Sequence, residues 1–347
     1  MTTFEASLAL LSAIVGGGIV GVPFSLLHCG IPLGVFLNFA FAILAYFASV
    51  LYLKSKDMVP VHVESLYELG FVSAGVASIY FISVTMMIAG FGVMMIYFII
   101  FGDISGSIAA AILKDENFFT SRFFYVAILS TSMIPLVLKK KLHEMKAVAA
   151  LLFVAIGLFV GLFIYQLMAI GNMENHDESY AQYYDIEFDF SVITSINIIT
   201  VAYSFQLNLF PTFNSLQNKT NKTALDFVSL ALIMTFFVYV SLGILSVYMF
   251  GEALKKSVLD NVDEEADASS YVIRIAFLIV LACHIPYAFF PVKESLLIVV
   301  DEIQNKSMTK AIQYKIQQHL YPSIKDRVGE GEEEGESDHA YLSMNYI

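Results

Sequence analysis

Charged side chains are scarce in this sequence. Asp, Glu, Lys and Arg account for 14% of the 347 residues, whereas 58% are hydrophobic and the mean hydropathy is +0.72. Soluble proteins carry roughly 25% charged residues, and a soluble globule of this length could not bury so much apolar surface. The scarcity excludes a soluble enzyme, a nucleic-acid-binding protein and a disordered chain, and it indicates that lipid solvates part of the protein.

Carboxylates are absent from the middle of the long apolar runs. Most of the 31 acidic residues, which give the chain a net charge of −12, lie in three polar segments at 174–189, 252–267 and 330–338. A relay of membrane carboxylates for protons is therefore not expected.

Cysteines and enzyme motifs are equally sparse. The two cysteines, Cys29 and Cys283, indicate no disulfide or metal framework. His143-Glu144 lacks a second histidine at position 147, so the zinc-helix pattern is incomplete. The sequence has neither a phosphate-binding glycine loop nor a Gly-x-Ser-x-Gly elbow. We expect no enzymatic activity, no cofactor and no metal site.

Apolar runs of about 20 residues, the length that a bilayer core requires, alternate with polar turns. This pattern predicts an all-α polytopic membrane protein, because a β-barrel would show alternating strands of about 10 residues. One transmembrane domain is expected over residues 1–300. Its eight predicted spans cover residues 6–27, 32–53, 72–101, 121–138, 147–169, 189–211, 226–250 and 271–299.

Residues 301–347 are too polar for another span. Met308, Ile312, Ile316 and Leu320 recur every four residues and predict an amphipathic helix. We favour a helix packed on the bundle over one lying on the membrane surface. The Gly- and Glu-rich stretch 328–338 predicts a disordered acidic linker.

Lysines are unevenly divided between the two sets of loops. The loops after the second, fourth and sixth spans carry more of them than the loops on the other side, and basic loops stay in the cytoplasm. Both termini are therefore predicted to be cytoplasmic. The membrane itself is either the plasma membrane or an endolysosomal or vacuolar membrane.

The first span contains three consecutive glycines, Gly16, Gly17 and Gly18, followed by Pro23. Such a run forms helix poorly, and unwound backbone at membrane depth is tolerated only where it is buried or lines a cavity. Paired broken helices hold substrates and ions in secondary transporters. Close helix packing by small residues is the alternative interpretation.

Polar side chains interrupt two later spans. The sixth span carries Tyr203, Ser204, Gln206 and Asn208 in an otherwise apolar run, a partial match to a second broken helix. Hydrogen bonding between helices would also explain these residues. In the eighth span, His284 is either a satisfied bundle residue or a titrating group in a transport pathway.

Four stretches of the chain, at 12–21, 196–213, 243–261 and 273–297, resemble parts of one family. They are similar to the broken first helix, the sixth helix, the end of the seventh and the eighth helix of the amino acid/auxin permease family. The nearest branch is that of the sodium-coupled neutral amino acid transporters. The eighth-helix stretch is the most specific, and the match runs through nearly the whole chain.

The resemblance implies the inverted-repeat (LeuT-type) transporter fold and secondary active transport of amino acids by alternating access. Half-helix N-termini would attract the substrate carboxylate and freed carbonyls its ammonium. Because the span centres lack acids, we expect neutral substrates. The residues that would hold the amino acid lie at the two breaks, namely Gly16, Gly17, Gly18, Tyr203, Ser204 and Phe205.

Two positions depart from the sodium-coupled branch. The Asn of helix one and the Thr of helix eight that bind Na⁺ in that branch correspond to Ser12 and His284. Histidine is a poor ligand for Na⁺ because hard cations prefer oxygen. The coupling ion is therefore H⁺ or Na⁺, and we hypothesise that protonation of His284 has replaced Na⁺.

The chain is shorter than the family's usual fold. We expect a fold truncated after the eighth helix, and a truncated gene model as its cause. The alternative function is a non-transporting amino acid sensor or a truncated pseudo-transporter. The expected partners are an amino acid and the lipid bilayer, not nucleic acid, and the sequence indicates no oligomeric state.

Overall fold

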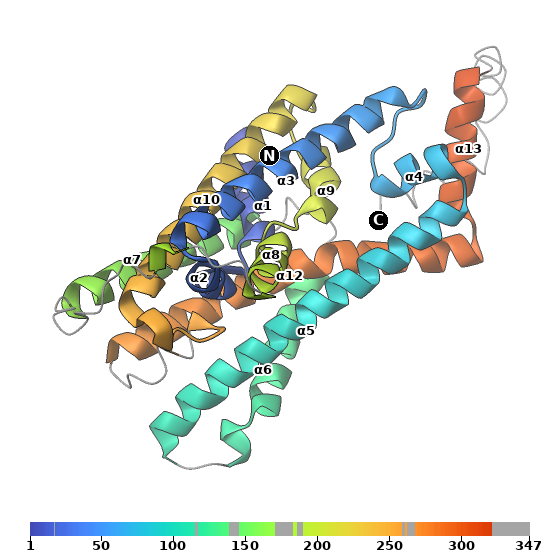
Figure 1. The fold of residues 1–347 in the computed structure, drawn as a ribbon. Helices are drawn as coiled ribbons and strands as arrows, with labels where there is room; N and C mark the ends of the chain where they lie inside the picture. Colours follow the sequence, from blue (N-terminus) through green and yellow to red (C-terminus); the bar gives the residue numbers. More distant parts are fainter. Residues whose placement is uncertain are drawn as a thin grey trace.

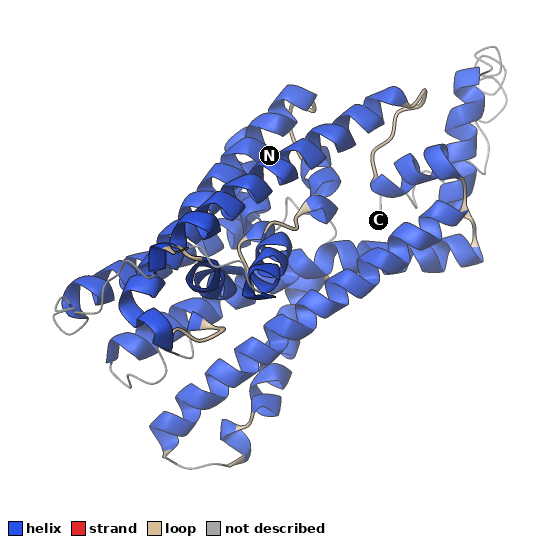
Figure 2. Ribbon diagram, viewed as in Figure 1, coloured by secondary structure: helices blue, strands red, loops and turns tan. Residues whose placement is uncertain are grey.

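The computed structural model describes residues 1–16, 18–114, 117–138, 146–170, 183–185, 190–258, 261 and 268–320. Within these ranges all regular secondary structure is helical (Figures 1 and 2). The α-helices are α1 (Thr3–Ile14), α2 (Gly18–Cys29), α3 (Ile31–Met58), α4 (Leu66–Ala74), α5 (Ala77–Leu113), α6 (Arg122–Val137), α7 (Lys146–Ile170), α8 (Phe190–Ala202), α9 (Leu209–Asn214), α10 (Asn221–Phe250), α12 (Ala268–Gln304) and α13 (Ser307–Leu320). Short 3₁₀ helices are η1 (Phe118–Thr120), η4 (Gln206–Asn208) and η5 (Gly251–Ala253).

Each predicted span overlaps one or two α-helices, but not every helix is long enough to cross a bilayer. Among the described residues, five segments are long and apolar enough, and the bent pair of α1 and α2 would make a sixth. The helix α6 and the apolar part of α7, Ala147–Leu162, are shorter than the roughly 20 residues that a bilayer core requires. The five segments are Ile31–Met58, Ala77–Leu113, Phe190–Asn214, Asn221–Ala253 and Ser270–Gln304.

The third predicted span, 72–101, is displaced in the structure. Gly75 ends α4 with a φ of 79°, a left-handed conformation that glycine adopts without steric cost. The long helix α5 therefore begins only at Ala77 and continues to Leu113. The sequence pattern merged the last residues of α4 with α5.

The helices form one bundle around a continuous apolar core. Figure 1 shows α5 and α12, each 37 residues long, crossing against one another. The helix α10 packs along α1, α2 and α3, and α2 packs along α8. These contacts bring the first and sixth predicted spans together in the middle of the bundle.

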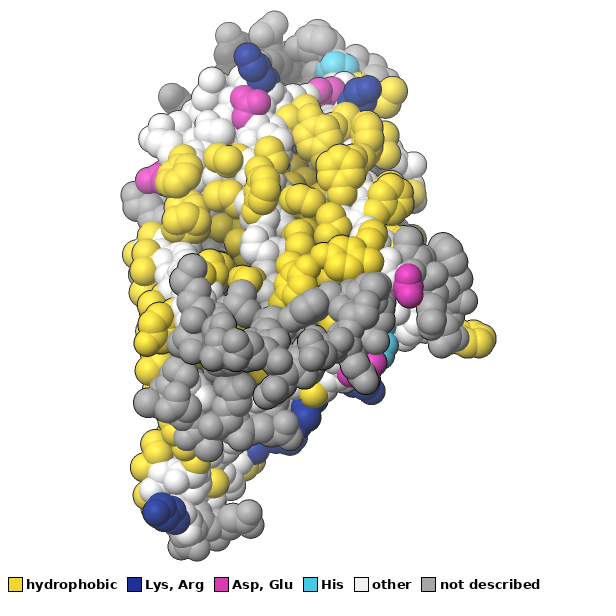
Figure 3. All heavy atoms as spheres, turned by 60° about the vertical axis from the view of Figure 1, so that its left-hand side comes forward, with side chains coloured by type: hydrophobic (Ala, Val, Ile, Leu, Met, Phe, Trp, Pro, Cys, Tyr) yellow, Lys and Arg dark blue, Asp and Glu magenta, His cyan; other side chains and the backbone are white. Residues whose placement is uncertain are grey.

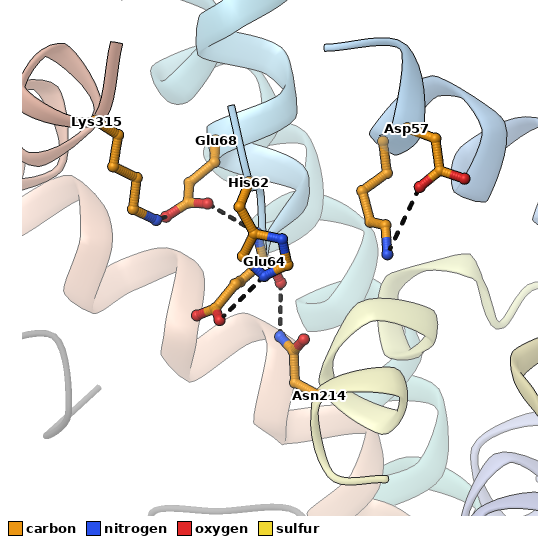
Figure 4. Close-up of polar contacts among 7 residues, drawn as sticks. Asp57, His62, Glu64, Glu68, Asn214 and Lys315 are labelled. Atoms are coloured by element: carbon orange, nitrogen blue, oxygen red, sulfur yellow. Dashed lines mark hydrogen bonds and ion pairs between the residues drawn. The ribbon is translucent and has the colours of Figure 1, made fainter. Parts of the chain in front are cut away.

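The segments at one end of the bundle are joined by polar contacts. The amino group of Met1 donates a hydrogen bond of 2.6 Å to the carbonyl of Ser215, in the loop before α10. The Asn214 amide donates to the Glu64 carbonyl at 2.6 Å, in the loop after α3 (Figure 4). The N-terminus and the loops after the second and sixth predicted spans thus contact one another, as a shared side of the membrane requires.

At the opposite end, Gly30 abuts Asp185 and Gly251 abuts Tyr183. These contacts join the connections after the first, fifth and seventh predicted spans, which the lysine distribution assigns to the other side. Which end faces the cytoplasm stays a prediction. The lysine-rich loop 139–145 and the acidic linker 328–338 lie outside the described residues.

The amphipathic helix α13 packs on α4 and α12. Ile312 is only 1% exposed, and it packs with Tyr67 and Phe71 of α4 and with Ile298 of α12. Figure 1 shows α13 and α4 beside each other at one end of α5. The side chain of Lys315 on α13 adds an ion pair of 3.0 Å to Glu68 of α4 (Figure 4).

Burial also fixes the protonation state of the neighbouring tyrosine. It raises the pKa of Tyr67 far above its ordinary value, because the phenolate would lose its hydration. The hydroxyl therefore stays protonated, 2.8 Å from the Ser295 hydroxyl of α12.

The outer surface is apolar over a broad face. Figure 3 shows hydrophobic side chains spread across this face, with charged groups near its margins. Large hydrophobic side chains are also exposed along α5, for example Phe81 at 75% and Ile88 at 71%. Such a surface is unstable in water and stable in lipid, which agrees with an integral membrane protein.

Candidate functional site

The first helix break separates α1 from α2, which are bent by 65° relative to each other. Val15 ends α1 in an extended conformation (φ −81°, ψ 92°). Beyond it, Gly16 faces two side chains from other helices, because an added Cβ would lie 2.5 Å from the Tyr97 hydroxyl and 2.6 Å from His284 Nε2. Any larger residue at position 16 would collide with both groups.

The second helix break separates α8 from α9. Tyr203 donates its N–H to Ile199 at 3.1 Å, but the N–H of Ser204 bonds only three residues back, to Val201. The helix has therefore tightened into a 3₁₀ turn and stops. Pro211 lies in the first turn of α9, where its missing N–H costs no helical hydrogen bond.

The two breaks meet in the middle of the bundle. Gly18, the first residue of α2, lies so close to Ala202, the last residue of α8, that an added Cβ would lie 2.8 Å from the Ala202 Cβ. The sequence pattern indicated each break separately, and the structure places them side by side.

Tyr239 of α10 connects the two broken helices. Its hydroxyl lies 3.0 Å from the carbonyl oxygen of Ile14, at the end of α1, and 3.2 Å from that of Ala202, at the end of α8. The Tyr239 ring meets the Tyr203 ring edge-on, with centroids 5.5 Å apart. Tyr239 is 0% exposed, so one buried side chain contacts both breaks.

His284 of α12 lies against the first break. Its imidazole is 2% exposed and faces the main-chain carbonyls of Ser12 and Val15. The Tyr97 ring packs edge-on at 4.8 Å between centroids. Nδ1 of His284 has no hydrogen-bond partner among the described residues. Carbonyl oxygens and an imidazole together can hold a proton or a small cation.

The structure brings together most of the predicted site residues. Ser12 and His284 are neighbours, as the resemblance to the family implied, although the Ser12 hydroxyl bonds within its own helix to Leu8 at 2.8 Å. Gly18 lies where the two breaks meet, whereas Gly16 faces Tyr97 and His284. Gly17 lies outside the described residues. The roles assigned to these residues stay predictions.

The three predicted residues of the second break differ in environment. Tyr203 and Phe205 are buried, at 2% and 0% exposed, and the Tyr203 hydroxyl has no hydrogen-bond partner in the described structure. Ser204 is exposed, and its hydroxyl bonds back to the Thr200 carbonyl at 2.8 Å. Tyr203 therefore offers an unused donor at the breaks, whereas the Ser204 side chain does not.

A cavity of about 340 Å³ lies away from the breaks, between α3 and α10. Its walls include Phe39, Tyr46, Leu232 and Phe236, and they are almost entirely apolar. The α-carboxylate and α-ammonium groups of an amino acid substrate would lose their hydration there and would find no hydrogen-bond partner. The chemistry of the helix breaks identifies the candidate site better than the size of this cavity does.

Sequence reasoning missed Tyr97 and Tyr239. Each is a tyrosine inside a long apolar run, in α5 and α10. A buried tyrosine hydroxyl usually needs a hydrogen-bond partner, so its presence in a span was a usable signal. The pattern could not show which helix would supply the partner.

Comparison with known proteins identifies the family. The chain matches the profile of the family described as "Transmembrane amino acid transporter protein" over residues 1–321. It is 23% identical over 226 residues to "Vacuolar amino acid transporter 5" of Saccharomyces cerevisiae, which covers 62% of this chain and 49% of that protein.

Animal proteins are similar over more of the chain. "Putative sodium-coupled neutral amino acid transporter 10" of Xenopus laevis is 23% identical over 305 residues, 86% of this chain and 28% of that protein. "Solute carrier family 38 member 10" of Homo sapiens is 22% identical over 306 residues, 87% of this chain and 26% of that protein. The chain thus spans about half of the yeast relative and about a quarter of the animal ones.

These matches confirm the resemblance found in the sequence, as well as the expectation of a protein that is not an enzyme. The profile covers nearly the whole chain, including both helix breaks and α12. The chain belongs to the family of transmembrane amino acid transporter proteins.

Proposed function

We propose that this chain is a secondary active transporter of neutral amino acids that works by alternating access. The observation that carries the proposal is the meeting of the two helix breaks at Gly18 and Ala202. Helix ends expose main-chain N–H and C=O groups that lack intrahelical partners. Such groups recognise the carboxylate and ammonium that all amino acids share.

The inverted-repeat fold is part of the same proposal. It is supported by the two discontinuous helices, α1–α2 and α8–α9, which belong to the first and sixth predicted spans. Corresponding positions in two inverted repeats would break in the same way. The neutral substrate is supported by the lack of acidic residues in the middle of the predicted spans.

The coupling ion belongs to the proposal as well. We place it beside His284, where the main-chain carbonyls of Ser12 and Val15 face the imidazole. Protonation of His284 would place an imidazolium cation beside these carbonyl dipoles. In this proposal, that cation replaces the Na⁺ of the sodium-coupled branch. Uptake should then increase when the outer solution is acidified, because the carrier takes up a proton with its substrate.

Uptake by the purified full chain in proteoliposomes tests the function. The probes are radiolabelled L-alanine, L-leucine and L-glutamine, with Na⁺ or choline outside and with or without an inward proton gradient. We expect uptake in choline and its stimulation by the proton gradient. Strict dependence on Na⁺ would overturn proton coupling, and binding without uptake would indicate the sensor function instead.

Two glycine variants test whether the first helix break belongs to the transport site. Gly16→Ala should reduce uptake at least tenfold, because the new methyl group would displace His284 or Tyr97. Gly92→Ala in α5 is the matched control, since a Cβ there meets nothing within 4 Å. Equal loss in both variants would contradict the assignment of the site to the first break.

A further inference from the structure

Tyr239 lies on α10, outside both broken helices, yet its hydroxyl reaches the end of each. Ile14 is the last residue of α1 and Ala202 the last residue of α8. Their carbonyl oxygens lie 3.0 Å and 3.2 Å from the single Tyr239 hydroxyl. The two residues are far apart in sequence, and Tyr239 is one side chain that contacts both.

The ends of two helices meet here with like partial charges. The last carbonyls of a helix lack intrahelical donors and carry the negative end of its dipole. Two such ends in an apolar interior repel each other unless a proton donor lies between them. Tyr239 is fully buried, so its hydroxyl proton supplies that donor without help from bulk water.

Both breaks also hold the tyrosine in place. An added Cβ on Gly18 would lie 2.8 Å from the Tyr239 hydroxyl, so only glycine leaves room for it. The Tyr203 ring meets the Tyr239 ring edge-on, at an interplanar angle of 87°. Each break thus contributes a packing contact in addition to its carbonyl.

We infer that Tyr239 is the positioning residue of the amino acid site. Its hydroxyl ties the end of α1 to the end of α8 and so sets the spacing of the main-chain groups at the two breaks. The inference rests on the proposed function, in which those groups hold the substrate. Hydrogen bonds weaken steeply with distance and angle, so substrate binding depends on this spacing.

Hydrogen exchange of the full chain in nanodiscs tests the connection without requiring transport. Tyr239→Phe removes only the hydroxyl. We expect amide exchange to rise about tenfold in both 8–16 and 199–208, because the one buried hydroxyl proton that the two helix ends share is lost. Exchange that rises in neither segment, or in α10 alone, would overturn the inference.

The matched control is Thr235→Val, one turn away on the same helix. Thr235 is 0% exposed, and its hydroxyl bonds within α10 to Ala231 at 2.9 Å. Valine keeps the shape of the threonine side chain and removes a buried hydroxyl whose hydrogen bond stays within α10. We expect wild-type exchange at both breaks in this variant, and deprotection there would show that the effect is general.

Uptake then tests the role in substrate binding. Tyr239→Phe should raise KM about tenfold, by the same factor for L-alanine, L-leucine and L-glutamine, because they share the groups that the breaks bind. Thr235→Val should keep the wild-type KM. An unchanged KM, or factors that differ among the substrates, would overturn the role. If wild type and Thr235→Val both lack uptake, the proposed function fails, and hydrogen exchange still decides whether Tyr239 joins the breaks.

Discussion

Single residues decide how closely the broken helices approach. Gly18 has no side chain, and this absence lets α2 pack against Ala202 and leaves room for the Tyr239 hydroxyl. Gly16 likewise lacks a side chain, and this leaves room for the Tyr97 hydroxyl and the His284 imidazole. The glycine run therefore serves in close packing as well as in breaking the helix, so the two interpretations left open by the sequence are compatible.

Gly18→Ala should destabilise the protein by about 1–3 kcal/mol, the usual cost of overpacking a dense interior. Its methyl group would meet the main chain of Ala202, at 3.1 Å from Cα, and the backbone cannot turn away as a flexible side chain can. The measurement is the thermal unfolding midpoint in detergent. Gly92→Ala, which has free space, should keep or raise the midpoint, and equal midpoints for the two variants would contradict this account.

Elements outside the predicted spans are held by tertiary contacts rather than by their own stability. The helix α13 has 14 residues, and isolated helices of this length are marginal in water. Its N-terminal turn is capped from α12, because the Glu302 carboxylate accepts the N–H of Thr309 at 3.2 Å. Ile312 then joins it to α4 through buried apolar surface.

Ile312→Ala should release α13 from the bundle. Loss of a buried isoleucine costs about 2–5 kcal/mol, which exceeds what a short helix and one ion pair can offset. We expect amide protection to disappear over residues 307–320, measured by hydrogen exchange, while α10 stays protected. Gln313→Ala, at an exposed neighbour, should leave the protection unchanged. Retained protection in Ile312→Ala would show that the apolar contact is dispensable.

The whole molecule has two polar ends and an apolar belt. Met1 and the loop before α10 lie at one end, whereas Gly251 and Tyr183 meet at the other. Between them α10 runs for 30 residues, about 45 Å at 1.5 Å per residue, which spans a bilayer. The two loops that flank α10 should therefore face opposite sides of the membrane.

Cysteine labelling should place these loops on opposite sides. Lys219→Cys and Lys256→Cys are exposed positions before and after α10, and the native Cys29 and Cys283 are buried. In sealed membrane vesicles with the cytoplasmic face outward, an impermeant maleimide should label position 219. It should reach position 256 only from the extracytoplasmic side. Labelling of both positions from one side would contradict the predicted topology.

Several features of this protein follow from its sequence alone. The need for lipid follows from composition. The apolar runs also indicate roughly where most of the long helices lie, although the third one merged the end of α4 with α5. Both breaks are visible because three glycines, or a proline behind polar residues, weaken a helix locally. These are short-range effects, so a single stretch of chain contains all the information that they require.

Only the tertiary structure showed what lies at the breaks. Tyr239 meets Ile14, 225 residues away in sequence, and Ala202, 37 residues away, and no local pattern predicts such a contact. The exposure of Ser204 and the packing of Tyr97 on His284 are likewise set by neighbouring helices. A helix end can accept a donor from any helix that reaches it, so its partner depends on how the whole bundle packs.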